Sequence, residues 1–105
     1  MKKEVEIVRE GNALRCVLSC EIDHHHAKTL RERVDRALFV EKPRVLILDF
    51  SAVPFMDSSG IAFVLGRASS AHTLGTQICL CGLGQENRRL LSLSQIEKHP
   101  NITIE

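Results

Sequence analysis

The feature that most constrains the fold is an almost wholly aliphatic segment, residues 44–50, with a helical pattern on each side of it. A short run of this kind is typical of a central strand that is covered on both faces of a sheet. Helices before and after such a strand favour parallel neighbours, because the chain must cross over the sheet to return in the same direction. The sequence therefore predicts an α/β domain built around one buried strand.

The segments around this strand extend the pattern in both directions. Apolar residues alternate with polar ones over residues 5–7 and 14–20, and Gly11 and Asn12 supply a turn, which predicts an opening β-hairpin. Asp23 then caps a helix that ends before Pro43. Its inward face is predicted to consist of Ala27, Leu30, Val34 and Leu38.

The second half of the chain repeats the alternation of helix and strand. A helix after residue 57 is predicted to end at Gly75 and to turn inward Ile61, Val64, Leu65, Ala68 and His72. A strand at 77–81, a helix at 86–93 and a short strand at 102–104 follow. We predict one domain over residues 1–105, with a mixed, mostly parallel sheet whose functional loops lie at the carboxyl ends of the strands.

The charge balance limits the class of partner. Fourteen basic residues against thirteen acidic ones give a net charge of +1, which provides no strong field for nucleic acid or anionic lipid. No apolar run approaches the ~20 residues that cross a bilayer, and the lysines at positions 2 and 3 precede acidic residues instead of a signal sequence. We expect a cytoplasmic protein whose partners are proteins or small ligands, not nucleic acid or membrane.

The turn that follows the aliphatic strand contains the most informative side chains. Asp57, Ser58, Ser59 and Gly60 lie where the strand has ended and the next helix begins. One interpretation is structural, because Asp57 caps the helix by accepting from its first free N–H groups. The other is functional, because a phosphoryl group on a serine at a helix start is favoured by the helix dipole. The sequence leaves both interpretations open.

Enzymatic interpretations of the same chain have less support. A serine hydrolase requires a nucleophile, a histidine and an acid in one constellation, and the turn at Ser58 lacks the Gly-x-Ser-x-Gly surroundings. His72 and His99 are not placed by the sequence to serve that serine. The sequence Gly82-Leu83-Gly84 lacks the third glycine of a dinucleotide loop and predicts an ordinary turn. We therefore expect a protein without catalytic activity and without a cofactor.

Metal binding is also not favoured. His24, His25 and His26 are adjacent, and neighbours on a helix diverge by ~100°, whereas chelation on a helix uses positions i and i+4. These imidazoles are predicted to be solvated in a first helical turn, where they could contact a protein. The cysteines lie among aliphatic residues without the spacing of a zinc site, which predicts buried free thiols; they are Cys16, Cys20, Cys79 and Cys81.

Four segments together resemble one known family. Residues 21–27, 48–51, 55–61 and 65–67 are similar to the anti-sigma factor antagonists of the STAS domain family, nearest to its sporulation members, the antagonists of the anti-sigma F factor. The resemblance covers about residues 4–95. It depends most on the Asp-Ser-Ser-Gly turn combined with the Asp-His-His segment upstream, where His26 replaces the more usual threonine.

The resemblance implies a phosphorylatable switch in the regulation of transcription. In this family the unmodified antagonist binds an anti-sigma factor that is also a serine kinase, and the sigma factor is thereby released. The kinase then phosphorylates a serine that corresponds to Ser58, and a PP2C-type phosphatase restores the unmodified form. The predicted partner-binding residues are Asp23, His24, Asp57, Ser59 and Gly60.

A second hypothesis stays open at this point. The same resemblance is compatible with a STAS binding module of another pathway, either a stress-response antagonist or a scaffold subunit. The sequence alone does not distinguish these partners, because the turn at Ser58 is common to both hypotheses.

Overall fold

The computed structural model describes residues 4–105, so the charged start at Met1, Lys2 and Lys3 lies outside the described residues. The chain opens with an antiparallel hairpin of β1 (Val5–Glu10) and β2 (Ala13–Leu18), as predicted. The elements that follow are α1 (His24–Glu41), β3 (Val45–Asp49), α2 (Ser58–Thr73), β4 (Gln77–Cys81), α3 (Gln85–Leu93), the short 3-10 helix η1 (Ile96–Lys98) and β5 (Ile102–Ile104).

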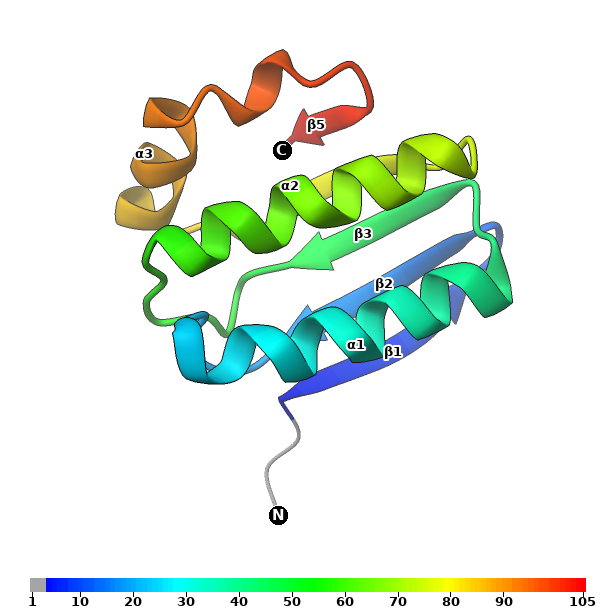
Figure 1. Cartoon of the computed structure of the whole chain (residues 1–105), viewed down its shortest axis with the longest axis horizontal. Helices are drawn as coiled ribbons and strands as arrows, with labels where there is room; N and C mark the ends of the chain where they lie inside the picture. Colours follow the sequence, from blue (N-terminus) through cyan, green and yellow to red (C-terminus); the bar gives the residue numbers. More distant parts are fainter. Residues whose placement is uncertain (1–3) are drawn as a thin grey trace.

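The five strands form one sheet in the order β1-β2-β3-β4-β5 (Figure 1). Only the opening hairpin is antiparallel, and β2, β3, β4 and β5 pair in parallel with their neighbours. This is the mixed, mostly parallel sheet that the sequence predicts. Because β2 and β3 are parallel neighbours, the segments that leave their carboxyl ends emerge at the same edge of the sheet.

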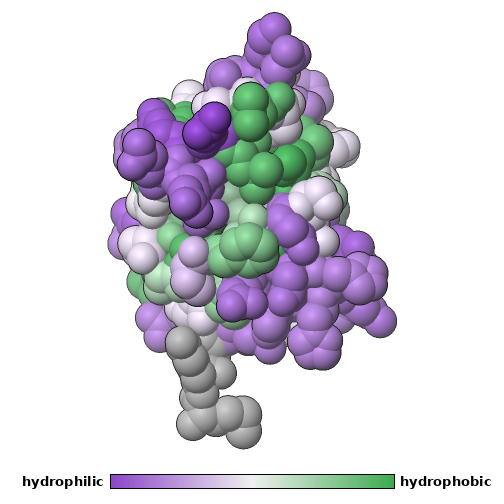
Figure 2. All heavy atoms as spheres, turned by 90° about the vertical axis from the view of Figure 1, so that its left-hand side faces the viewer, coloured by the Kyte–Doolittle hydropathy of each residue, from purple (hydrophilic) through white to green (hydrophobic). Residues whose placement is uncertain are grey.

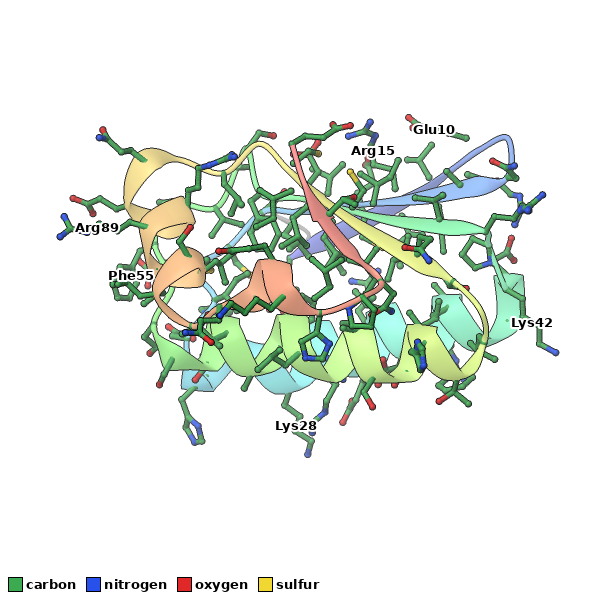
Figure 3. All side chains as sticks on the ribbon, turned by 90° about the horizontal axis from the view of Figure 1, so that it is seen from above. Glu10, Arg15, Lys28, Lys42, Phe55 and Arg89 are labelled. Atoms are coloured by element: carbon green, nitrogen blue, oxygen red, sulfur yellow. The ribbon has the colours of Figure 1, made fainter. Side chains whose placement is uncertain are left out.

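Both long helices cover the same face of the sheet (Figures 1 and 3). Along β3, Leu46 and Leu48 point to that face and are fully buried, whereas Val45, Ile47 and Asp49 are only half-buried. The prediction that this strand is covered on both faces is therefore wrong. Side chains of neighbouring strands shield its far side in place of a helix, as when Arg15 Nη1 donates to Asp49 Oδ2 over 3.1 Å.

The inward faces of the helices follow the predicted period with one exception. In α1 the buried residues are Leu30, Val34 and Leu38, and the exposed residues are polar except near the end of the helix, where Phe39 and Val40 are exposed. No helix within residues 4–105 is long and apolar enough to cross a bilayer. In α2, Val64 and Ala68 are buried as predicted, but His72 is exposed, so its inward placement was wrong. Arg67 takes a buried position instead, because Asp35 of α1 lies 2.6 Å from its Nε.

Candidate functional site

The starts of α1 and α2 are held side by side at the carboxyl edge of the sheet. Ile22 and Met56 form a parallel β-bridge, in which Ile22 N donates to Phe55 O over 3.0 Å and Asp57 N donates to Ile22 O over 3.3 Å. Each bridge residue directly precedes a capping aspartate. The bridge therefore brings Asp23 and Asp57 into register, although 34 positions separate them in the sequence.

Each of these aspartates caps its own helix. Asp23 Oδ1 accepts from the backbone N of His26 over 2.9 Å and lies 2.8 Å from the Nδ1 of the same residue. Asp57 Oδ1 accepts from Ser59 N over 2.7 Å. The backbone hydrogen bond from His26, supported by the imidazole, lowers the pKa of Asp23 below its ordinary value. Asp23 thus presents a negative charge beside a helix start at neutral pH.

Ser58 is the first residue of α2, and its side chain is exposed. The capping bond of Asp57 uses the backbone of Ser59, which leaves the Ser58 hydroxyl outside the cap. Ser59 itself is half-buried beside it. The capping and phosphoacceptor interpretations of the turn are therefore compatible, since different atoms serve them.

Gly60 has a packing role that the sequence did not show. It is buried, and a Cβ at this position would lie 2.7 Å from Met56 Sδ and 2.9 Å from Met56 Cβ. The absence of a side chain lets Met56 pack against the first turn of α2, which supports the bridge to Ile22. Of the predicted partner-binding residues, Gly60 is buried and affects the site only through the packing of Met56. The others are half-buried or exposed around Ser58; they are Asp23, His24, Asp57 and Ser59.

An exposed aromatic residue adjoins this turn. Figure 2 shows apolar atoms gathered, among hydrophilic side chains, on the face that carries the starts of both long helices. Phe55 is 51% exposed and lies in the loop that leads into α2. Phe55 was not among the predicted partner-binding residues, because the exposure of an apolar residue next to a turn cannot be inferred from the sequence.

The loop before α2 is supported by α3. Asn87, which is 7% exposed, donates from Nδ2 to Val53 O over 3.3 Å. Gly82 has a φ of 70°, and a Cβ there would lie 2.7 Å from Ser51 N. The Gly82-Leu83-Gly84 segment thus forms a tight strand-to-helix turn against this loop, which gives its first glycine a structural explanation.

The histidines divide into two groups. His24 and His25 are exposed on the first turn of α1, while His26 turns back to Asp23. The parallel bridge places His24 at the level of Ser58. His72 is fourteen residues further along α2 than Ser58, roughly 21 Å at the helical rise, and it lines a hollow with His99. The structure therefore brings neither of these two histidines to the serine.

The prediction of buried thiols holds for only one cysteine. Cys16 is fully buried on β2, and burial raises the pKa of its thiol to about 12. Cys20, Cys79 and Cys81 are half-buried, so the prediction was wrong for these three. The last two lie on the sheet face opposite the long helices, because β4 alternates about the buried Ile78 and Leu80.

Comparison with known proteins identifies this arrangement. The model of the STAS domain matches residues 4–104. The chain belongs to the STAS domain family. An anti-sigma F factor antagonist of Paenibacillus polymyxa is 30% identical over 98 residues, which cover 93% of this chain and 84% of that protein.

Two solved structures show the same fold. The anti-sigma factor antagonist SpoIIAA in its unphosphorylated form superposes with a TM-score of 0.79 at 24% identity, covering 96% of this chain and 87% of that one. SpoIIAA of Bacillus in its phosphorylated form gives a TM-score of 0.72 at 24% identity, covering 96% and 90%. The STAS fold is therefore assigned from the family match and from the superposed structures together.

Proposed function

We propose that this protein is an anti-sigma factor antagonist whose docking to its partner is switched by phosphorylation of Ser58. The observation that carries the proposal is the exposed hydroxyl of Ser58 between two capped helix starts. It is supported by the 30% identical relative, which is an anti-sigma F factor antagonist, and by the phosphorylated SpoIIAA of similar fold. The partner would be an anti-sigma factor serine kinase, and a PP2C-type phosphatase would reverse the modification in the cytoplasm.

The docking face consists of Asp23, His24, Phe55, Asp57, Ser58 and Ser59, the half-buried or exposed residues around the bridge. Phe55 offers an aromatic anchor that is half exposed, and such residues contribute strongly to protein interfaces. The two aspartates offer acceptors to basic or amide groups of a partner. A phosphoryl group on Ser58 would add about −1.5 to −2 charges next to them. Release then follows because docking would have to desolvate this added charge beside two carboxylates, and because the phosphoryl group occupies space at the same face.

The fold tolerates this modification because Ser58 has no part in the cap. The cap bond joins Asp57 to the backbone of Ser59, and the Ser58 side chain is exposed. A phosphoryl group in the first helical turn is also favoured by the dipole of α2, by ~0.3–1 kcal/mol. The proposed switch therefore changes the surface and leaves the scaffold intact.

The first experiment tests the acceptor directly. The protein is incubated with its cognate kinase and ATP, and the modified residue is mapped by mass spectrometry. We expect one phosphoryl group on Ser58, because its hydroxyl is exposed in the docking face. Modification confined to Ser59 or to distant serines such as Ser69 and Ser92 would contradict the assignment.

The second experiment separates the charge from the side chain. We expect Ser58→Ala to bind the kinase within about twofold of the unmodified protein, since the hydroxyl is not part of the cap. Ser58→Glu should bind at least about tenfold more weakly, because it fixes a negative charge among two carboxylates. Ser69→Glu is the matched control, since Ser69 is an exposed serine further along α2. Equal binding by Ser58→Ala and Ser58→Glu in calorimetry would rule out release by charge.

A further inference from the structure

A small pocket lies between α1 and α2, next to the docking face. Its volume is about 140 Å³, and it is lined by Ala27, Arg31, Ser59, Ala62, Phe63 and Arg67. Both helices start at the same edge of the sheet, so the pocket lies close to their positive dipole ends. Two guanidinium groups and one serine side chain therefore line one hollow of small volume.

The charges around this pocket do not balance. Arg67 is only 4% exposed, its Nε lies 2.6 Å from Asp35 Oδ1, and its Nη1 donates a long bond of 3.4 Å to Phe63 O. Arg31 is exposed and forms no ion pair with any residue in 4–105. Burial lowers the pKa of Arg67, and the charge of Arg31 lowers it further. The carboxylate of Asp35 acts in the other direction and raises this pKa. Asp35 thus compensates one of two neighbouring cations.

Ser58 adjoins this pocket without being one of its lining residues. Ala62, four residues further along α2, lines the pocket, and side chains at positions i and i+4 lie on the same face of a helix. Ser59, the next residue, lines it directly. A group attached to the Ser58 hydroxyl can therefore lie over the groove between the helices. The bridge sets Ser58 level with His24, so Arg31, seven residues and about 10 Å further along α1, meets such a group when its long side chain extends back toward the helix starts.

We propose that this pocket receives the phosphoryl group of phosphorylated Ser58, with Arg31 as its direct ion-pair partner and Arg67 as the buried charge behind it. This inference rests on the proposed function, since it requires Ser58 to be the acceptor. An Arg–phosphate pair is a strong, charge-assisted contact. This contact offsets the repulsion between the phosphoryl group and Asp57. It also holds the modified side chain of Ser58 in the groove between α1 and α2.

The test measures the second ionisation of the phosphoserine, which lies near pH 6 when unperturbed. Phosphoserine is introduced at position 58 by genetic encoding, so no kinase is needed, and the phosphorus NMR signal is titrated. A nearby cation favours the dianion, so Arg31→Gln should raise this pKa by about 0.5. Arg33→Gln is the matched control, because Arg33 is an exposed arginine of α1 that lines a separate groove with Arg9 and Arg36. We expect it to shift the pKa by less than about 0.1.

Three outcomes would overturn the inference. The first is the same titration curve in the unsubstituted protein, Arg31→Gln and Arg33→Gln. The second is saturable binding of inorganic phosphate to the unmodified protein that phosphoserine at position 58 does not displace, which would assign the pocket to a free anion. The third is a loss of kinase binding by unmodified Arg31→Gln as large as that of Ser58→Glu, which would assign the pocket to an acidic side chain of the partner.

The failure of this inference is distinguishable from the failure of the proposed function. A kinase that leaves Ser58 unmodified would refute the switch, yet the encoded phosphoserine would still report whether Arg31 binds it. Conversely, kinase modification of Ser58 together with an unchanged titration in Arg31→Gln would keep the switch and remove the ion pair. The two experiments use different reagents and different readouts.

Discussion

The two ends of the α1–α2 pair differ in where their polar groups lie. At the starts of the helices, the capping carboxylates of Asp23 and Asp57 are half-buried and Ser58 is exposed. Toward the opposite end two polar side chains are inside the molecule. Thr76, 1% exposed, donates from Oγ1 to Pro43 O over 2.7 Å, and Asn101, 3% exposed, donates from Nδ2 to Ala68 O over 2.9 Å.

This difference separates the groups that stabilise the fold from the groups that are proposed to control docking. A buried polar group stabilises the fold only while its partner is in place, because an unpaired group in the interior costs its full desolvation. A polar group at the surface is replaced by water without that cost. Chemistry on Ser58 can therefore alter what docks at one end, while the buried bonds at the other end hold the helices on the sheet.

The largest expected effect on stability is at the buried end. Asn101→Ala removes an amide that donates to Thr76, directly before β4, and to Ala68 in α2, so Ala68 O loses that donor. We expect the free energy of unfolding to fall by about 2 kcal/mol, measured by urea denaturation. Kinase affinity should stay within about twofold. A loss of affinity that parallels the loss of stability would show that the two ends are not independent.

The next largest effect is expected at Gly60, where one substitution should lower both the stability of the fold and the affinity for the kinase. Gly60→Ala places a Cβ 2.7 Å from Met56 Sδ, so Met56 must move and the bridge to Ile22 must shift. We expect a loss of about 1–2 kcal/mol in unfolding free energy and, in contrast to Asn101→Ala, weaker kinase binding.

Gly66→Ala is the control for this comparison. Gly66 lies in the same helix, and a Cβ there meets nothing within 4 Å. Alanine is the better helix former, so this variant should be neutral or more stable by up to about 1 kcal/mol, with unchanged kinase affinity. Equal behaviour of the two variants would contradict the packing role of Gly60.

Much of the fold could be predicted because it depends on period and turn chemistry. The hairpin, the order of elements and the strand at 77–81 follow from local alternation and from glycine or proline at the ends. The exposed face of β3 could not be predicted, because an aliphatic strand does not reveal whether a helix or the side chain of Arg15 covers it. His72 is exposed although it was predicted to face inward, and Arg67 is buried in the same helix. The sequence of α2 does not reveal this, because the partner of Arg67 is Asp35 on another helix.

The candidate site was predictable in composition but not in arrangement. The capping role of Asp57 follows from its place before a helical pattern, and the structure shows this bond. The bridge between Ile22 and Met56 joins segments that are distant in the sequence, so no local pattern predicts it. The pocket at Arg31 depends on the packing of two helices and was missed for the same reason.

A smaller effect is expected when the cap of α2 is removed. Asp57→Ala deletes the acceptor of the Ser59 N–H group, and we expect a loss of about 1 kcal/mol in unfolding free energy. Asp57→Asn keeps a side-chain oxygen for the cap and removes the charge, so it should cost only a few tenths of that. If Asp57→Asn weakens kinase binding as much as Asp57→Ala does, the partner recognises the carboxylate and not the cap.

The smallest effect concerns the pH dependence of the α1 cap. The pKa of Asp23 is lowered, first by the backbone bond from His26 and then by its imidazole, so the carboxylate form is favoured in the folded state. The stabilisation by this cap is therefore fully present above the unfolded pKa of about 3.9 and is lost as pH falls through the lower folded value. His26→Thr should raise the folded pKa part of the way back, because the backbone bond remains.

An NMR titration of the Asp23 carboxyl carbon measures this shift directly. His25→Thr is the control, since it removes an adjacent imidazole from the exposed side of the same turn and leaves the Asp23–His26 contact in place. If the two variants titrate alike, the imidazole of His26 has no direct influence and the backbone bond alone holds the charge. A higher pKa in His26→Thr alone would show that the histidine at position 26 adjusts the charge of the docking face.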